Sequence, residues 1–401
     1  MSRSDGAGRR QPATRAVHGP NPAHGPMSTP IVHSTTYSFP SLDAMNEAQD
    51  RGQTGAYYQR LGHPTIAACE ARLADLEGAE RSLLFASGVA ALACTFLACL
   101  SSGDHVVALE QSYGGTHDLF KWGVQHFGWR CEFVDARAPE TWERAFRPET
   151  RLLHVESPTN PILAVVDIER AAKLAHARGA RLSVDNTFAS PVGQQPLAFG
   201  ADFVVTSATK SIGGHADVLA GLVSGSARAL EPVWKARKIF GPILDPEAAW
   251  RIERSLKTLP LRTQAANANA LELASRLAAH GAVAQVFYPG LARHPGHDVA
   301  KRQMTLGFGP VLAFEVRGGA PAAEALVNAL KLVHHAVSLG GVESLASLPA
   351  YTSHIQLGAE GRARAGIPEG LVRLSVGIED VNDLWADLTQ ALEAAVPARV
   401  G

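Results

Sequence analysis

The chain has 401 residues, 46% of them hydrophobic, and its 37 Lys and Arg residues nearly balance its 38 Asp and Glu residues. This length and apolar content allow a large buried core in two or three domains, and the formal net charge of −1 gives no long-range attraction to nucleic acid or to an anionic membrane. The four cysteines lack metal-ligand or disulfide spacing, and no apolar segment is long enough for a membrane span or a signal peptide, so we expect a cytoplasmic protein without a bound metal.

The first half of the chain predicts a parallel sheet covered by helices. Residues 1–26 are rich in Gly, Pro, Arg and Ser, and we expect them to lack a fixed structure. Beyond them, short apolar runs alternate with segments of helical periodicity. The predicted strands are 82–85, 105–109, 130–134, 152–156, 181–185, 203–206 and 220–224, and the predicted helices include 64–77, 88–99, 115–126 and 167–178.

The second half predicts a smaller unit of mixed type. A helix-rich segment covers residues 246–279, and the last helix covers 381–395. Predicted strands between them are 283–288, 309–316, 332–335 and 372–376. We therefore predict an α/β fold with an N-terminal arm (1–60), a large domain built on a mostly parallel seven-stranded sheet (61–250) and a smaller α+β domain (251–401).

Lys210 is the most informative residue. It follows the apolar strand 203–206, is flanked by the hydroxyls of Ser207 and Thr209, and precedes two glycines. A desolvated lysine has a lowered pKa and can attack an aldehyde as a neutral amine, while neighbouring hydroxyls bind a phosphate. Lys210 is therefore our candidate for the covalent anchor of pyridoxal 5'-phosphate.

Two other strand ends have groups that such a cofactor requires. Ser87, Gly88 and Val89 open an alanine-rich helix after a strand, where free backbone N–H groups and the helix dipole attract a phosphate. Asp185 ends an apolar strand, so its carboxylate is suited to pairing with a protonated pyridine nitrogen. Open α/β sheets bind ligands at these strand ends.

Three further side chains are suited to holding the cofactor ring or a substrate. Tyr113 lies beside two glycines and can stack on a ring or exchange a proton. Asn160 lies in a proline-bounded turn and can donate to the phenolic oxygen of the cofactor. Arg373 is a cation inside an apolar strand and binds a carboxylate, either a structural acid or that of the substrate. Alone, each motif also fits a structural residue; together they indicate a cofactor site.

In order along the chain, these segments resemble the cysteine and methionine metabolism family of pyridoxal-phosphate enzymes. That family includes cystathionine γ-lyase, cystathionine γ-synthase, cystathionine β-lyase and methionine γ-lyase. The resemblance covers residues 29–392. It is carried by Tyr58-Gln59-Arg60, Tyr113-Gly114-Gly115-Thr116, Glu156-Ser157-Pro158, Asp185-Asn186-Thr187, Ser207-Ala208-Thr209-Lys210, Ser338-Leu339-Gly340-Gly341 and Arg373-Leu374-Ser375.

The resemblance implies fold type I of these enzymes and a role for each matching residue. Lys210 holds the cofactor and moves protons, Asp185 pairs with the ring nitrogen, and Tyr113 stacks on the ring. The implied phosphate ligands are Ser87, Gly88, Val89, Ser207 and Thr209, with Tyr58 and Arg60 reaching in from a neighbouring subunit; the implied substrate ligands are Asn160, Ser338 and Arg373. A site shared between chains implies a dimer, paired into a homotetramer.

Four positions bear on the reaction within this family. Glu343 and Gly115 weigh against methionine γ-lyase, and Leu339 weighs against the enteric type of β-lyase. Asp118 stands where γ-lyases and γ-synthases tend to have an arginine, and it either attracts a distal ammonium group or is a helix-surface residue. Glu343 and Asp118 are thus candidate substrate ligands.

We therefore expect a carbon–sulfur lyase of trans-sulfuration that converts L-cystathionine to cysteine, 2-oxobutanoate and ammonia by γ-elimination. The alternatives left open are γ-replacement on an O-acyl-L-homoserine, cystathionine β-lyase and methionine γ-lyase. A nicotinamide-dependent oxidoreductase would need a GxGxxG turn, which residues 87–90 do not supply. A non-catalytic protein on this scaffold is expected to have lost Lys210, Asp185 or Tyr113, and all three are present.

Overall fold

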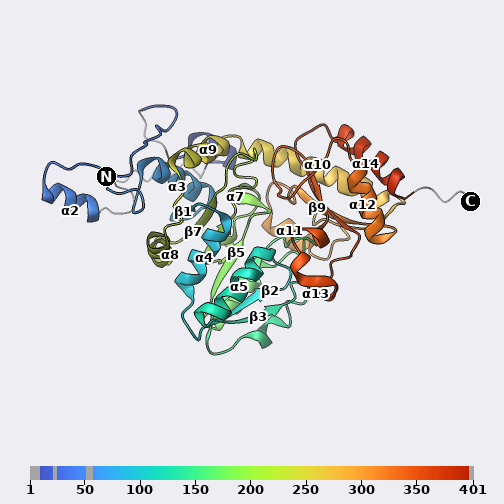
Figure 1. Cartoon of the computed structure of the whole chain (residues 1–401), viewed down its shortest axis with the longest axis horizontal. Helices are drawn as coiled ribbons and strands as arrows, with labels where there is room; N and C mark the ends of the chain where they lie inside the picture. Colours follow the sequence, from blue (N-terminus) through green and yellow to red (C-terminus); the bar gives the residue numbers. More distant parts are fainter. Residues whose placement is uncertain (1–9, 21–24, 51–56, 397–401) are drawn as a thin grey trace, which may run out of the picture.

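The computed structural model describes residues 10–20, 25–50 and 57–396. The chain folds around two sheets, a seven-stranded large sheet and a five-stranded small sheet, with helices packed against both (Figure 1). The large sheet contains β1 (Arg81–Phe85), β2 (His105–Leu109), β3 (Arg130–Val134), β4 (Thr150–Glu156), β5 (Arg181–Asp185), β6 (Phe203–Thr206) and β7 (Gly221–Gly225).

The large sheet has the strand order β1-β7-β6-β5-β4-β2-β3. Strands β2 to β6 pair in parallel, whereas β7 runs antiparallel to both β6 and β1. Because successive side chains of a strand point to opposite faces, Val106 and Ala108 pack on one side and Val107 and Leu109 on the other. The mostly parallel seven-stranded sheet between helices is confirmed.

Helices cover both faces of the large sheet. On one face lie α4 (Gly88–Cys99), α5 (Gly114–Phe127) and α8 (Ala227–Phe240); α6 (Ile168–Ala177) covers the other, and α3 (Pro64–Glu77) and α9 (Pro246–Leu256) pack beside β1 and β7. Several helices begin at a side chain that accepts from the first turn. Ser87 Oγ accepts from Ala90 N, and Asp167 Oδ1 accepts from Arg170 N, both at 3.1 Å. These caps satisfy donors that the helix itself leaves free.

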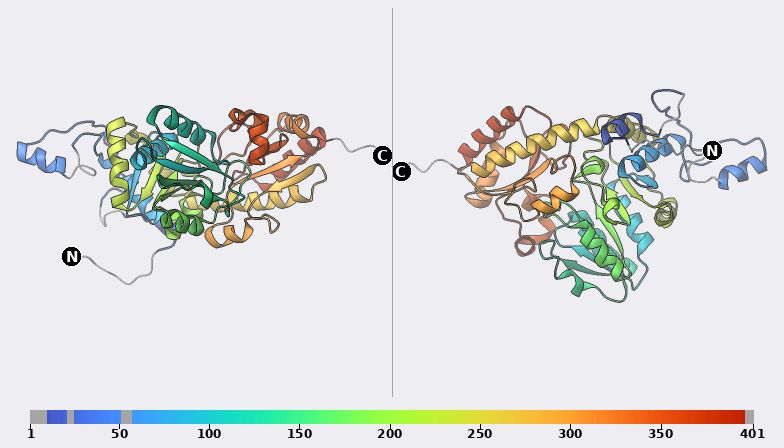
Figure 2. Two further views of the ribbon diagram at one scale, coloured as in Figure 1. Left: turned by 90° about the horizontal axis from the view of Figure 1, so that it is seen from below. Right: turned by 180° about the vertical axis from the view of Figure 1, so that it is seen from behind.

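The small sheet has the order β10-β11-β12-β9-β8. Its strands are β8 (Val283–Phe287), β9 (Val311–Val316), β10 (His334–His335), β11 (Leu345–Ser347) and β12 (Leu371–Ser375). One face packs against α10 (Leu259–Ala279), α12 (Gly319–Ala329) and α14 (Val381–Ala395). Helix α10 runs along the molecule toward α14 (Figure 1, Figure 2).

The other face of the small sheet packs against the large-sheet part of the chain. Val311, Ala313 and Leu371 contact Ile162 and Phe188, which follow β4 and β5. Within β12, Arg373 lies between Val372 and Leu374, whose side chains belong to the helix-covered face. The alternation along the strand therefore directs Arg373 toward the large sheet.

Several elements differ from the sequence-based expectations. The segment 1–26, expected to lack a fixed structure, contains helix α1 (Pro12–His18), which starts at a proline and carries the buried residues Arg15 and Ala16; residues 1–9 and 21–24 lie outside the described part. The predicted strand 332–335 is reduced to β10, and the three-residue β11 and the helix α8 were not predicted. A strand of three residues is too short to show alternation, and α8 contains Pro232, which opposes a helix prediction.

The N-terminal segment carrying α2 (Leu42–Asp50) extends away from the rest of the chain (Figure 1). No helix in the described ranges is long and apolar enough to cross a membrane. The domain limits at residues 60 and 250 stay a prediction.

Candidate active site

A cavity of about 560 Å³ lies at the carboxyl ends of the parallel strands, where the two sheets meet. This is the position at which open α/β sheets bind ligands. Predicted site residues that line it are Ser87, Gly88, Val89, Tyr113, Asn160, Asp185, Ser207, Thr209, Lys210, Ser338 and Arg373. Residues far apart in the sequence thus converge on one cavity.

Lys210 lies in the turn after β6, and its side chain is half-buried. Nζ of Lys210 donates to Oγ of Ser338 at 2.7 Å. Burial, and then the charge of Arg373, lower the pKa of Lys210 to about 8. Because this pKa lies well below the ordinary lysine value of about 10.4, a larger fraction of the amine is unprotonated near neutral pH and able to act as a nucleophile or base.

The turn that follows Lys210 is fixed by a buried arginine. Nη1 of Arg262 donates to the carbonyl of Ser211 at 2.7 Å, and Nη2 donates to the carbonyl of Ser255 at 3.0 Å. Gly214 has φ +72°, and a Cβ there would overlap the Arg262 guanidinium. The glycine after the lysine is therefore needed for backbone conformation and for the approach of Arg262.

Asp185 ends β5 and is only 8% exposed. Its Oδ1 accepts from the backbone N–H of Thr187 at 3.0 Å, and Thr187 Oγ1 accepts from the N–H of Ser207 at 2.9 Å. Burial raises the pKa of Asp185, while the bonds from Thr187 oppose that shift. A cation placed in the cavity beside this carboxylate would favour its ionised form.

The N-terminus of α4 forms one wall of the cavity. A Cβ at Gly88 would lie 2.9 Å from Cβ of Ser207, so only glycine lets Ser207 approach this helix end. The wall combines first-turn backbone donors with a serine hydroxyl, which is suited to a phosphate. Thr209 differs, because its hydroxyl donates to the carbonyl of Ala220 at 3.1 Å and would have to release that bond to donate to a ligand.

Tyr113 lies at the start of α5 with its side chain 42% exposed. Its backbone N–H donates to Oε2 of Glu156 at 2.9 Å. Burial, followed by the nearby charge of Asp185, raises the pKa of Glu156 well above the usual range. A Cβ at Gly115 would overlap the Tyr113 ring, so a cysteine there would require the ring to move.

Arg373 is 6% exposed. Nη1 donates to Oδ1 of Asn160 at 3.1 Å, and Nη2 donates to the carbonyl of Ser338 at 3.0 Å. Nε is buried and has no hydrogen-bond partner among the described residues. Burial lowers the pKa of Arg373 to about 10, so the group stays cationic at neutral pH. An oriented buried cation with a spare donor is suited to a carboxylate ligand.

Four predicted site residues do not line this cavity. Asp118 and Glu343 are exposed, and neither belongs to the cavity wall. Tyr58 is 43% exposed, with the Arg60 guanidinium over its ring, while Nη1 of Arg60 donates to the Lys238 carbonyl at 3.0 Å.

Several cavity residues were not predicted as site residues. Thr187 joins Asp185 to Ser207, and its position two residues after the carboxylate is the signal that could have identified it. Glu156, the last residue of β4, was named only as part of a family motif and given no role. Others provide apolar or hydroxyl surface from both halves of the chain: Leu92, Phe188, Leu219, Val337, Leu339, Tyr351, Thr352 and Ser353.

The family profile described as "Cys/Met metabolism PLP-dependent enzyme" matches residues 13–393. The chain belongs to this family. It is 42% identical over 371 residues to cystathionine gamma-lyase of Bacillus subtilis, spanning 92% of this chain and 95% of that protein. It is 40% identical to cystathionine beta-lyase of Lactococcus lactis subsp. cremoris, spanning 95% and 98%. Relatives at 41–42% identity are named cystathionine gamma-synthase, L-methionine gamma-lyase and O-succinylhomoserine sulfhydrylase.

Among solved structures, cystathionine gamma-lyase from Lactobacillus plantarum complexed with L-serine superposes with a TM-score of 0.90. The identity is 38%, and the match covers 96% of this chain and 99% of that one. The family member is thus a pyridoxal-phosphate enzyme of fold type I. Its cavity fits the cofactor: a half-buried lysine of lowered pKa, a buried carboxylate, and a helix N-terminus with Ser207 beside it line the same space.

Proposed function

We propose that this family member is a carbon–sulfur lyase that converts L-cystathionine and water to cysteine, 2-oxobutanoate and ammonia by γ-elimination. Pyridoxal phosphate, when bound, supplies an electron sink for negative charge next to the substrate amino group. The residues proposed to hold it are Lys210 as covalent anchor, Asp185 at the ring nitrogen, Tyr113 on the ring face, and Ser87, Gly88, Val89, Ser207 and Thr209 at the phosphate. Asn160 is proposed to donate a hydrogen bond to the phenolic oxygen of the cofactor ring.

Substrate binding is assigned to the cation of the small sheet. Arg373 binds the α-carboxylate, because its guanidinium is oriented by Asn160 and by the Ser338 carbonyl and keeps a free Nε donor. Ser338 contributes both its carbonyl to Arg373 and its hydroxyl to Lys210. The α-carbon is thereby held near the amine of the lysine.

Proton transfer is assigned to Lys210. A lysine with a pKa near 8 can accept the proton from the α-carbon, give that proton up again as an ammonium group, and then, as a neutral amine once more, accept the proton from the β-carbon. The sulfur on the γ-carbon leaves as a thiol after it receives a proton from Tyr113 or Lys210.

The observation that carries γ-elimination of cystathionine is the position of Asp118. Its side chain is exposed and absent from the cavity wall. Among the described residues, the acidic ones of that wall are Glu156 and Asp185, both buried at strand ends. The described residues of one chain therefore place no carboxylate at the edge of this cavity for the distal ammonium group that a β-lyase-like binding mode would use. Glu343, which is also exposed, is not proposed as a substrate ligand of its own chain.

The test is product analysis of purified enzyme with L-cystathionine as the only substrate. Cysteine and 2-oxobutanoate are expected. Pyruvate and homocysteine would overturn the proposal in favour of β-elimination. If neither pair forms, an O-acyl-L-homoserine supplied with a thiol tests γ-replacement, and L-methionine tests methionine γ-lyase.

The proposed assembly is a homotetramer of dimers that share active sites. It is supported by Tyr58 and Arg60, which are exposed and lie outside the cavity of their own chain. They follow in sequence the segment with α2, which extends away from the rest of the chain (Figure 1). Light scattering should give four chains, and Arg60→Ala should weaken cofactor affinity without changing the protein fold. The proposed setting is the cytoplasm, because the cysteines lack a disulfide spacing.

A further inference from the structure

A second cavity, of about 890 Å³, lies between the two sheets and shares no lining residue with the Lys210 cavity. The large-sheet part contributes the segment after β3, the segment after Asn160 and the start of α6. The small-sheet part contributes β8, the loop that follows it and the turn before β12. The cavity is larger than the Lys210 cavity and has no part in the proposed reaction.

The lining of this cavity combines apolar surface with unpaired cations. Trp142, Ile162 and Phe287 are among its apolar residues. Arg170 and Arg293 also line it, are exposed, and make no side-chain hydrogen bond or ion pair with the described residues. An apolar surface beside free guanidinium groups is suited to a small molecule with an apolar body and an anionic group.

One carboxylate lines the same cavity. Asp167 is already paired, because its Oδ2 lies 2.8 Å from Nη2 of Arg302, and its Oδ1 accepts from Arg170 N. His294 also belongs to the wall, and burial lowers its pKa to about 4, so it is neutral at pH 7. The unpaired charge of the lining is therefore positive.

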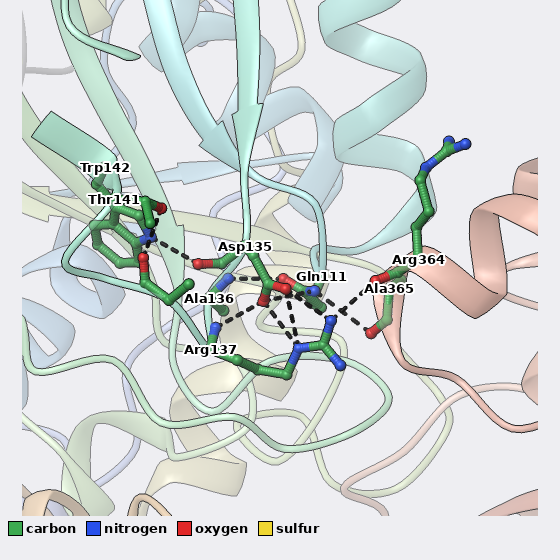
Figure 3. A network of polar contacts seen from close by, with 9 residues as sticks. Gln111, Asp135, Ala136, Arg137, Thr141, Trp142, Arg364 and Ala365 are labelled. Carbon is green, nitrogen blue, oxygen red and sulfur yellow. Dashed lines mark hydrogen bonds and ion pairs between the residues drawn. The ribbon is translucent and has the colours of Figure 1, made fainter. Parts of the chain in front are cut away.

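A polar network connects this cavity to the segment that carries Tyr113. Arg137 lines the cavity, and its Nη2 donates to Asp135 Oδ2 at 2.7 Å and to the Arg364 carbonyl at 2.9 Å. Asp135 Oδ1 accepts from Nε2 of Gln111 at 3.0 Å, and Gln111 lies two residues before Tyr113. Figure 3 shows these side chains directed toward one another between the two halves of the chain.

Two other walls of the cavity continue into residues of the Lys210 cavity. Ile162 lies two residues after Asn160, and Pro368 precedes the strand that carries Arg373. Gly366 has φ +73°, and a Cβ there would overlap the Arg137 guanidinium, so the wall allows no larger residue at this position. A ligand that moves these walls would also move Tyr113, Asn160 or Arg373.

We propose that the second cavity is a regulatory site for a small organic anion with an apolar body, such as an aromatic or aliphatic carboxylate or sulfonate. The anionic group pairs with Arg170 and Arg293, and the apolar body packs on Trp142 and Phe287. Occupancy is transmitted through Arg137 and Gln111 to Tyr113 and changes the apparent affinity for the substrate. The proposal does not depend on which reaction the enzyme catalyses.

The binding test uses the cofactor-loaded enzyme and the probe 8-anilinonaphthalene-1-sulfonate, titrated calorimetrically. The variant Arg170→Glu/Arg293→Glu is expected to bind the probe at least about 10-fold more weakly than the wild type. The control Arg228→Glu/Lys331→Glu makes the same change in net charge at exposed residues outside the cavity and should leave the affinity unchanged. Equal affinity of the two variants overturns the proposal, as does crystallographic density for the probe in the Lys210 cavity alone.

The proposed effect of this site on substrate affinity is tested by measuring KM with and without the probe. The substrate is the one that the enzyme turns over fastest in the product analysis described above. The wild type should show a change of KM of about 3-fold or more, in the range of ordinary allosteric coupling. Arg137→Gln removes the link to Asp135, and this variant should bind the probe with no change of KM. A probe that binds the wild type without changing KM, or that changes KM equally in Arg137→Gln, overturns the transmission route.

Discussion

Lys210 and Ser338 are 128 residues apart in the sequence, yet Nζ of the lysine donates to Oγ of the serine at 2.7 Å. Ser338 also has φ +91°, a conformation that is costly for a residue with a Cβ. The backbone that brings this hydroxyl to the lysine is therefore strained, and the neighbouring Gly340, with φ +74°, packs against Ser211.

Two substitutions of Ser338 distinguish the role of its hydroxyl from the energetic cost of its backbone conformation. Ser338→Ala and Ser338→Gly both remove the acceptor of Lys210, and both should lower kcat/KM by about 10-fold or more, as expected for a hydrogen bond to a charged group. Only glycine relieves the strain, by about 1 kcal/mol, so Ser338→Gly should melt at a higher temperature than Ser338→Ala. Equal melting temperatures would show that the backbone conformation carries no cost.

The amine of Lys210 should titrate near pH 8. The sign follows from burial, which disfavours the ammonium form and lowers the pKa, so the reactive neutral fraction rises as the pH increases through about 8. In protein freed of cofactor, competitive acetylation followed by peptide mass spectrometry should give a half-point near that value for Lys210. A half-point for Lys210 at the ordinary lysine value of about 10.4 would contradict the burial of this amine.

Adding one methyl group at Gly88 should weaken cofactor binding. In Gly88→Ala the new Cβ meets Cβ of Ser207 and forces the α4 end and the serine apart, at a cost of roughly 1–3 kcal/mol. We expect cofactor affinity, measured by dialysis and absorbance, to fall by about 10-fold. Gly281→Ala is the matched control, because nothing lies within 4 Å of a Cβ there; a similar loss in both variants would argue against the cradle.

Glu77 should make the protein less stable as the pH rises. Its carboxylate is buried, both oxygens lack a hydrogen-bond partner in the described structure, and burial raises its pKa to about 8. Between the ordinary pKa of about 4.3 and about 8, the unfolded chain releases this proton while the folded chain retains it, so the stability falls across that window. The loss is about 3–5 kcal/mol by pH 8.

The variant Glu77→Gln cannot ionise and tests this assignment. The melting temperature of the wild type should fall by several degrees more than that of the variant between pH 5 and pH 8. The constant cost of burying an amide shifts the variant equally at both pH values, so the slope is the quantity to compare. Parallel slopes would mean that Glu77 finds a cation or water when ionised.

The parallel strands and the residues at their carboxyl ends were predictable from the sequence, because apolar runs and the residue after each run are local features. Arg373 was predictable for the same reason, since a cation inside an apolar strand is unusual. The strained turn at Ser338 was not predictable, because the neighbouring Gly340 packs against Ser211, which follows a strand of the large sheet and is distant in sequence. The hydrogen bonds between the Thr209 hydroxyl and the backbone of Ala220 were not predictable either, because no local sequence pattern indicates them.

The distribution of the Lys210 cavity over two sheets has a consequence for how the enzyme matures. Asp185 ends a strand of the large sheet and Lys210 follows another, whereas Arg373 and Ser338 belong to the small-sheet part of the chain. A nascent chain whose small sheet has not yet docked would already possess an amine and a carboxylate for the cofactor, but no cation to select amino acids. Uptake of the yellow cofactor would then report only the first stage of folding, and amino-acid discrimination would report its completion.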